Sequence, residues 1–129
     1  MSKAFSLDSI YVNLRPDDST TVLKAGPRFW SAIDKRTDID DGRLMGKTRQ
    51  RKDWDHWERH PAGDEILVLL SGELELVLLT ARGERHTRLK AGQAFVVPKG
   101  SWHRGIVHKP GELMFITPGA GTEHRPVTL

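Results

Sequence analysis

Four side chains have the types and the spacing to hold a metal ion: Glu58, His60, Glu65 and His103. Glu58 and His60 are two positions apart, so on a β-strand they project from the same face. Residues 61–64, Pro-Ala-Gly-Asp, are a turn signal, after which the chain can double back and bring Glu65 close to the first pair. Imidazole and carboxylate donors together suit Zn, Mn, Fe or Ni.

His103 comes much later in the chain, just after the turn residues Pro98 and Gly100. Together with His60 and Glu65 it supplies two histidines and one carboxylate, the donor set of non-haem iron oxygenases. Spacing alone does not bring such distant residues to one point. The strands of the fold must bring His103 to His60 and Glu65.

After Gly42 the sequence consists of short apolar or alternating segments separated by Gly and Pro turns. Strands are predicted over residues 43–50, 54–60, 65–70, 73–80, 85–89, 93–97, 102–108 and 112–117. Strands that recur at this interval indicate an all-β sandwich or barrel. Residues 42–129 are predicted to form the barrel, and residues 1–41 a short N-terminal extension with an extended piece over 20–23 and a helical turn over 29–33.

The strand predicted over residues 66–70 is apolar on both faces, so its outer face also needs a cover. The N-terminal extension or a second subunit can provide it, and we expect a homodimer. We therefore expect the extension to pack on the barrel or on the dimer partner.

Two motifs resemble those of the cupin superfamily. The segment Glu58-x-His60-x4-Glu65-x6-Gly72 is similar to the first cupin motif, and Gly92-x5-Pro98-x-Gly100-x2-His103 to the second. The resemblance covers residues 42–118 and is to small bacterial single-domain cupins. It implies a jelly-roll β-barrel with a metal site near one mouth of the barrel.

Two positions depart from that pattern. Glu58 stands where the first motif has a histidine, and Val107 where an asparagine often closes the second. An anionic oxygen donor in place of an imidazole favours harder metals such as Mn or Fe, or indicates a weaker site or none. Because His60, Glu65 and His103 keep their positions, the resemblance implies one divalent metal ion, Fe, Mn, Zn or Ni, held by these three residues and Glu58.

Other residues are candidates for supporting the ligands or lining a pocket, and each has an ordinary alternative. His56 is otherwise a surface histidine, which is the favoured interpretation. Trp54 is otherwise part of the core, as are Trp57 and Trp102. Arg49 shares a strand face with Lys47 and is otherwise a solvated charge on an edge strand. The remaining histidines, His86, His108 and His124, are expected to be exposed.

Composition excludes several classes of function. With no cysteine there is no disulfide framework, no thiol nucleophile and no Cys-ligated zinc. The net charge of +3 is small and the signs are interspersed, unlike the basic face of a nucleic-acid binder. The longest aliphatic run, residues 66–70, is far too short to span a membrane. No apolar segment near the N-terminus resembles a secretory signal, so we expect a cytoplasmic protein.

The sequence thus predicts a metal-dependent enzyme of dioxygenase, isomerase or lyase type that acts on a small organic molecule. A cupin that binds or senses a small ligand without catalysis is the main alternative, and Glu58 in place of histidine favours it. A catalytically silent structural dimer is a weaker third, because it leaves the retained ligand residues unexplained.

Overall fold

The computed structural model describes residues 3–33, 36, 39 and 41–128. Its elements are β1 (Ile10–Leu14), β2 (Thr20–Lys24), α1 (Phe29–Ala32), β3 (Arg43–Gln50), β4 (His56–Arg59), β5 (Glu65–Leu69), β6 (Glu73–Thr80), β7 (Gly83–Lys90), β8 (Ala94–Val97), β9 (His103–Lys109), β10 (Gly111–Thr117) and β11 (Glu123–Pro126). No helix in these ranges is long and apolar enough to cross a membrane.

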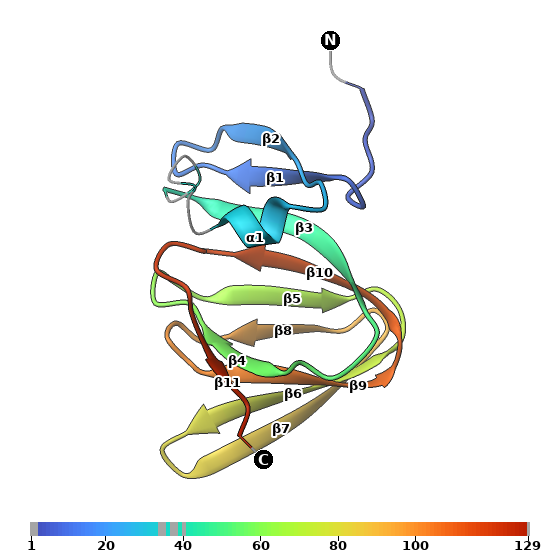
Figure 1. Ribbon diagram of the computed structural model, residues 1–129, viewed down its shortest axis with the longest axis vertical. Helices are drawn as coiled ribbons and strands as arrows, with labels where there is room; N and C mark the ends of the chain where they lie inside the picture. Colours follow the sequence, from blue (N-terminus) through green and yellow to red (C-terminus); the bar gives the residue numbers. More distant parts are fainter. Residues whose placement is uncertain (1–2, 34–35, 37–38, 40, 129) are drawn as a thin grey trace.

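The strands form two antiparallel sheets that face each other (Figure 1). One sheet has the strand order β2-β1-β3-β10-β5-β8, and the other has the order β11-β4-β9-β6-β7. This is the all-β jelly-roll barrel that the sequence predicted. Its consequence for the site is that β4 and β9 are neighbours in one sheet, whereas β5 belongs to the sheet opposite.

The core fills the space between the sheets, and alternation along each strand selects its residues. Leu74, Leu76 and Leu78 of β6 are buried on the same face, as the period of two predicted. Leu67 and Leu69 of β5 meet them from the opposite sheet, each 2% exposed or less. Leu67 also lines a cavity on its other side, so β5 contributes both to the core and to the wall of that cavity.

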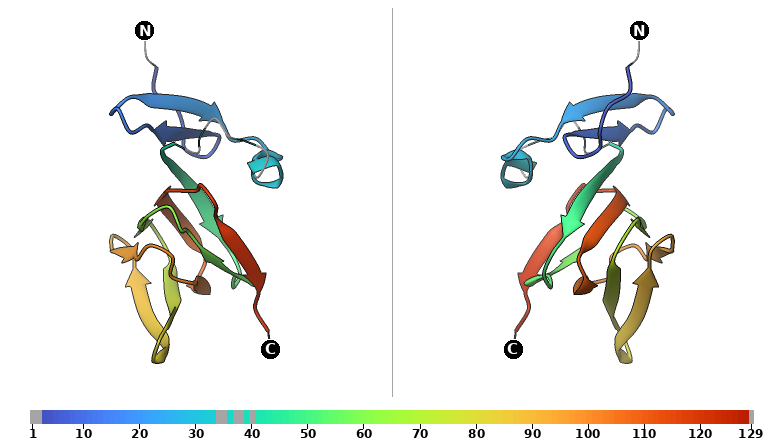
Figure 2. Two further views of the ribbon diagram at one scale, coloured as in Figure 1. Left: turned by 90° about the vertical axis from the view of Figure 1, so that its left-hand side faces the viewer. Right: turned by 90° about the vertical axis from the view of Figure 1, so that its right-hand side faces the viewer.

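Residues 10–24 form a hairpin whose first strand pairs with β3, so that β1 and β2 extend the first sheet at its edge. Figure 2 shows this hairpin beyond the end of the two facing sheets. Behind it, the rings of Tyr11 and Phe29 pack edge to face, with centroids 5.1 Å apart, and Tyr11 packs in the same way on Phe115 of β10. The division of the chain at residue 41 stays a prediction.

Most predicted strands match the structure to within two residues, but two elements were missed. β1 lies in a stretch that had no clear alternation, and β11 lies in a Gly- and Pro-rich tail. His124 is 50% exposed, as predicted, but it lies in a strand and not in an irregular tail. Backbone pairing with β4 holds it directly opposite Glu58.

Candidate metal centre

Glu58 is surrounded by four histidines on one sheet. Along β4, His56 and His60 lie two residues to either side of it and share its face. Across the sheet, Glu58 pairs with His103 of β9 on one side and with His124 of β11 on the other. The parity of one strand and the register of three therefore place four imidazoles around one carboxylate.

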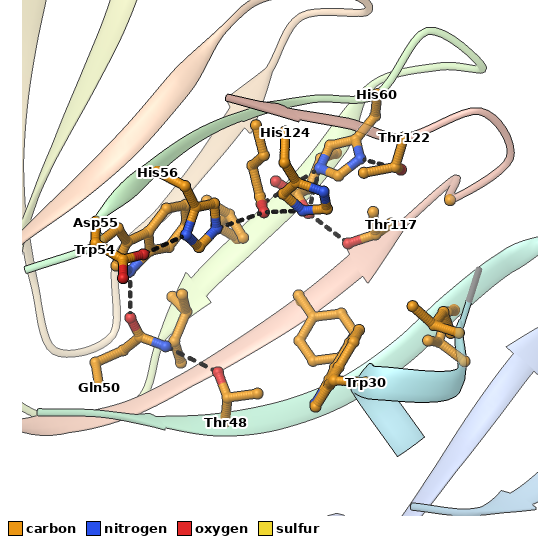
Figure 3. A pocket seen from close by; sticks show the side chains of 18 of the residues that line it. Trp30, Thr48, Gln50, Trp54, Asp55, His56, His60, Thr117, Thr122 and His124 are labelled. Carbon is orange, nitrogen blue, oxygen red and sulfur yellow. Dashed lines mark hydrogen bonds and ion pairs between the residues drawn. The ribbon is translucent and has the colours of Figure 1, made fainter. Parts of the chain in front are cut away.

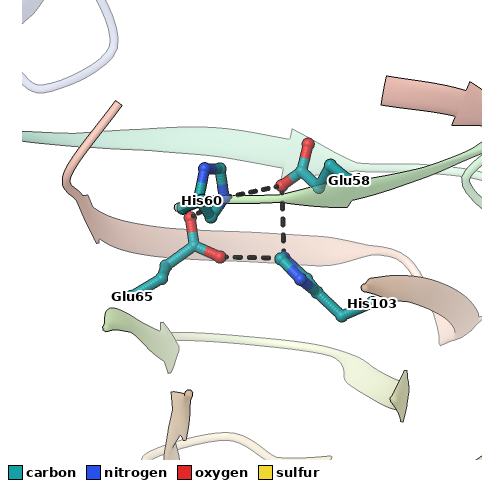
Figure 4. A group of neighbouring side chains, drawn as sticks. All are labelled: Glu58, His60, Glu65 and His103. Atoms are coloured by element: carbon teal, nitrogen blue, oxygen red, sulfur yellow. Dashed lines mark hydrogen bonds and ion pairs between the residues drawn. The ribbon is translucent and has the colours of Figure 1, made fainter. Parts of the chain in front are cut away.

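Glu65 completes the inner group from the opposite sheet. It begins β5 and is 3% exposed. Its Oε1 lies 3.0 Å from Nε2 of His103, and its Oε2 lies 3.2 Å from Nε2 of His60. The same two nitrogens lie 3.4 and 3.5 Å from Oε1 of Glu58. Figure 4 shows that both imidazoles point between the two carboxylates.

Two turns hold the histidines close to each other. Gly100 has a φ of +74°, a conformation that glycine adopts without strain, and its N–H donates to the carbonyl of His60 at 3.0 Å. The N–H of Lys99 also donates to the Asp64 carboxylate, at 2.8 Å. The loop before His103 is therefore tied to the loop after His60, which is why residues so distant in sequence meet.

The far nitrogen of each inner histidine has its own partner. Nδ1 of His103 lies 3.0 Å from the carbonyl of Ser101, which can only accept, so Nδ1 carries the proton. Nδ1 of His60 lies 2.8 Å from the Thr122 hydroxyl. Such partners fix the ring orientation and leave Nε2 for a metal. Glu65 is held similarly, because the Thr117 hydroxyl donates to it.

The charges of the inner group are mutually stabilising. Burial alone would lower the pKa of His60 and His103, but Glu58 and Glu65 outweigh it and raise these values to about 9 and about 10. Burial acts to raise the pKa of both glutamates, but hydrogen bonds from the surrounding imidazoles, His103 first, hold both below the usual value. A metal ion at this place would replace the protons of two imidazolium groups.

The donor atoms fit a small divalent ion. Nε2 of His60 is buried and makes no well-aligned hydrogen bond among the described residues, although it lies 3.5 Å from Oε1 of Glu58 and 3.2 Å from Oε2 of Glu65. Ligand atoms about 2.1 Å from a tetrahedral metal lie about 3.4 Å apart, and the four contacts measure 3.0 to 3.5 Å. The residues present therefore suit a metal held by two imidazoles and two carboxylates.

A cavity of about 900 Å³ opens in front of this group. Figure 3 shows Trp30, Trp54, His56 and His124 around it. Trp54 packs flat over Gly105, where even a Cβ would come within 2.9 Å of the indole ring, and its Nε1 donates to Gln50 at 2.6 Å. Leucines of β3, β5 and β10 and the ring of Phe115 supply the remaining apolar wall, and Arg51 and Lys52 add positive charge.

The other candidates fall into two groups. Trp54 lines the cavity, whereas Trp57 and Trp102 are not among its lining residues and pack instead under arginine side chains. His56 begins β4 with its side chain 39% exposed, as expected for a surface histidine at a strand start, and it also lines the cavity. Arg49 is at the edge of the cavity but forms an ion pair of 3.6 Å with Glu112.

Two features of the site were missed from the sequence, His124 and Thr122. Both follow Gly119 and Gly121, where no apolar alternation marks a strand. The only local signal was the bare presence of one more histidine. The register between β11 and β4, which the sequence does not display, places His124 opposite Glu58, and Thr122, just before β11, lies against His60.

Comparison with known proteins agrees with the fold. Residues 49–119 match the family model described as cupin domain, Cupin_2, and the chain belongs to this family. A segment of 48 residues is 38% identical to the uncharacterized protein YdbB of Bacillus subtilis strain 168 and spans 37% of this chain and 40% of YdbB. This chain therefore matches less than half the length of that curated relative.

Two solved structures are similar in fold. A recombinant oxalate oxidase in complex with glycolate has a TM-score of 0.52 and 19% identity, over 63% of this chain and 45% of that one. Peruvianin-I, a cysteine peptidase from Thevetia peruviana latex, has a TM-score of 0.56 and 15% identity, over 67% and 58% of the two chains. These likenesses establish the fold only.

Proposed function

We propose that this protein is a metal-dependent enzyme that acts on a small organic molecule. The observation that carries the proposal is the convergence of two Nε2 atoms and two carboxylates at the buried wall of an apolar cavity. Glu58, His60, Glu65 and His103 would hold one divalent ion, Fe, Mn, Zn or Ni. When bound, the ion would supply Lewis-acid chemistry or a site for oxygen.

The residues of the chain have distinct parts in this function. Thr122 and the Ser101 carbonyl orient the two imidazoles, and the Thr117 hydroxyl holds Glu65. Trp54 and Phe115 would bind the apolar part of a substrate and exclude water from the metal. The exposed Arg51 and Lys52 would attract an acidic group. We therefore favour a small organic acid with an apolar body, as a substrate of dioxygenase, isomerase or lyase chemistry.

Metal analysis of protein purified without a chelator is the first test. The wild type should contain at least one divalent ion per chain, and the His60→Ala/His103→Ala variant should lose the ion at this site. Substoichiometric metal that is the same in both proteins would overturn the proposal.

A screen of thermal stability then tests catalysis against simple binding. Small carboxylates, phenols and sugars are added to metal-loaded and metal-free protein. A compound that stabilises only the loaded protein and is turned over, with Fe(II) and O2 for an oxygenase, supports the enzyme. Equal stabilisation in both forms, without turnover, would show a binding or sensing protein instead.

We also propose a homodimer that covers the outer face of the first sheet. Ile66 of β5 pairs with Val96 of β8, which is 53% exposed, and with Ile116 of β10. The β1–β2 hairpin extends this sheet at its edge, through β3. Light scattering should give twice the chain mass for the wild type and a lower mass for Val96→Glu. A wild-type monomer would exclude the dimer.

A further inference from the structure

Glu58 faces two groups of histidines with its two oxygens. Oε1 faces His60 and His103, as described above, and Oε2 lies 3.5 Å from Nε2 of His56 and 3.5 Å from Nε2 of His124. The three residues of this outer group offer donor atoms that all lie within 4.8 Å of one another. One carboxylate therefore connects two sets of donors, an inner one and an outer one.

The contacts of the outer group resemble those between ligands of one metal. At 3.5 Å they are longer than strong hydrogen bonds, and they match the separation of about 3.4 Å between two ligands of a tetrahedral ion. The rings of His56 and His124 are 5.2 Å apart and inclined by 68°, so both face the same carboxylate oxygen without stacking on each other. Figure 3 shows His56 and His124 at the cavity.

A further carboxylate supports one of the two outer histidines. Nδ1 of His56 lies 2.9 Å from Oδ1 of Asp55, and Nε2 of the same ring faces Glu58. A carboxylate on the far nitrogen is the arrangement that orients histidine ligands and makes them more basic. The outer group is also open to solvent, since His56 and His124 are 39% and 50% exposed. An ion held there would keep free positions on the side of the cavity.

We propose that His56, His124 and Oε2 of Glu58 form a second divalent metal site, with Glu58 as the bridge between two metals. The proposal rests on the proposed function, because the inner ion is the one bridged. Paired metals clamp both oxygens of an anionic ligand, which suits a carboxylate or phosphate group on the cavity side. It also gives the two oxygens of Glu58 separate functions, since one faces the inner histidines and the other faces the outer ones.

The test is a calorimetric titration of chelator-treated full-length protein with Co(II), followed by Mn(II) electron paramagnetic resonance. Wild type should bind two equivalents, and the Mn(II) spectrum should change from isolated to spin-coupled ions as the second equivalent is added. His56→Ala/His124→Ala should bind one equivalent and show only isolated ions. Asp55→Asn should weaken the second equivalent by about 10–100-fold and leave the first unchanged.

A matched control uses His86 and His108, which flank Glu75 on the outside of the barrel. His86→Ala/His108→Ala removes two histidines from one glutamate at the surface and should leave both equivalents in place. The second site is overturned if wild type binds a single equivalent that His56→Ala/His124→Ala retains, or if two equivalents survive in His56→Ala/His124→Ala. A single equivalent that His56→Ala/His124→Ala abolishes and His60→Ala/His103→Ala retains would instead contradict the proposed function and leave the outer site standing.

Discussion

Histidines surround a glutamate at two places in this barrel, and the two places differ in burial and in the direction of the ring nitrogens. On the outside, Glu75 of β6 lies 2.7 Å from Nε2 of His108 and also bonds His86, which is 46% exposed. On the inside, His103 is fully buried between Glu58 and Glu65. Composition alone does not distinguish the two clusters.

The difference lies in where the ring nitrogens point. Both nitrogens of His86 are engaged by carboxylates, Nδ1 by Glu75 and Nε2 by Glu84. In the buried group the far nitrogens face a backbone carbonyl and a threonine hydroxyl, and both Nε2 atoms converge on one point. The cluster of Glu75, His86 and His108 thus forms surface ion pairs that solvent screens and that contribute little to stability. The group of Glu58, His60, Glu65 and His103 has the geometry of a ligand set.

Removing His103 is expected to give the largest difference between the clusters. His103→Ala leaves two buried carboxylates facing each other with one imidazole fewer. Loss of one partner from a buried ion pair costs about 3–5 kcal/mol. Urea unfolding in the presence of a chelator should show a loss of this size, and metal binding at the inner site should disappear. A loss below about 1 kcal/mol would show that the buried charges do not depend on each other.

The pH dependence of stability is the next largest expected effect. The pKa values of His60 and His103 are raised in the folded protein to about 9 and about 10. Their contribution to the free energy of unfolding is therefore complete below the pKa of histidine in the unfolded chain, near 6.5. It is lost as the pH rises through 9 to 10. The lowered pKa values of Glu58 and Glu65 have the opposite sign, and their contribution is lost as the pH falls below about 4.5.

Metal-free protein should therefore lose unfolding free energy between pH 7 and pH 10. The His60→Ala/His103→Ala variant should lose much less over this range, with a remainder from His56, whose pKa is also raised to about 9 by its hydrogen bond with Glu58. Unfolding in urea at several pH values measures both. If the free energy of unfolding fell equally with pH in both proteins, groups other than His60 and His103 would be responsible for the loss.

A smaller effect is expected from the hydroxyl that supports His60. Thr122→Val keeps the shape of the side chain but removes the partner of Nδ1. Such partners contribute about 10–100-fold to metal affinity, and the lost hydrogen bond costs about 1 kcal/mol. Calorimetry with Co(II) measures the first quantity. Thr80→Val, at an exposed hairpin end, is the control and should leave the affinity unchanged.

The smallest effect on stability is expected for the surface cluster of Glu75, His86 and His108. His86→Ala/His108→Ala should leave the free energy of unfolding almost unchanged, because both imidazoles are partly solvated and solvent screens their ion pairs. The metal content of protein purified without a chelator should not change. A loss of metal in this variant would remove the distinction between the two clusters.

The features that depend on local geometry could be predicted from the sequence. The alternation of Leu74, Leu76 and Leu78 and the spacing of the Gly and Pro turns depend on local geometry, and the predicted strands from residue 43 to residue 117 match the structure. The two motifs placed His60, Glu65 and His103 correctly at one point. Their role as metal ligands stays a prediction.

What could not be predicted depends on contacts between distant strands. His124 and His86 look alike in sequence, since each stands among charged residues near a glycine. Only the pairing of β11 with β4 brings the first to Glu58, and only the pairing of β7 with β6 takes the second to the outer face. Such registers reflect the whole sheet, and no local pattern encodes them.

The most direct test of the central claim is a crystal structure of protein purified without a chelator, with data collected above and below the absorption edge of the metal found in it. The account predicts an anomalous peak between Nε2 of His60, Nε2 of His103 and the carboxylates of Glu58 and Glu65. Metal that appears only at Glu75, or a buried group without a peak while metal is present in the sample, would contradict it.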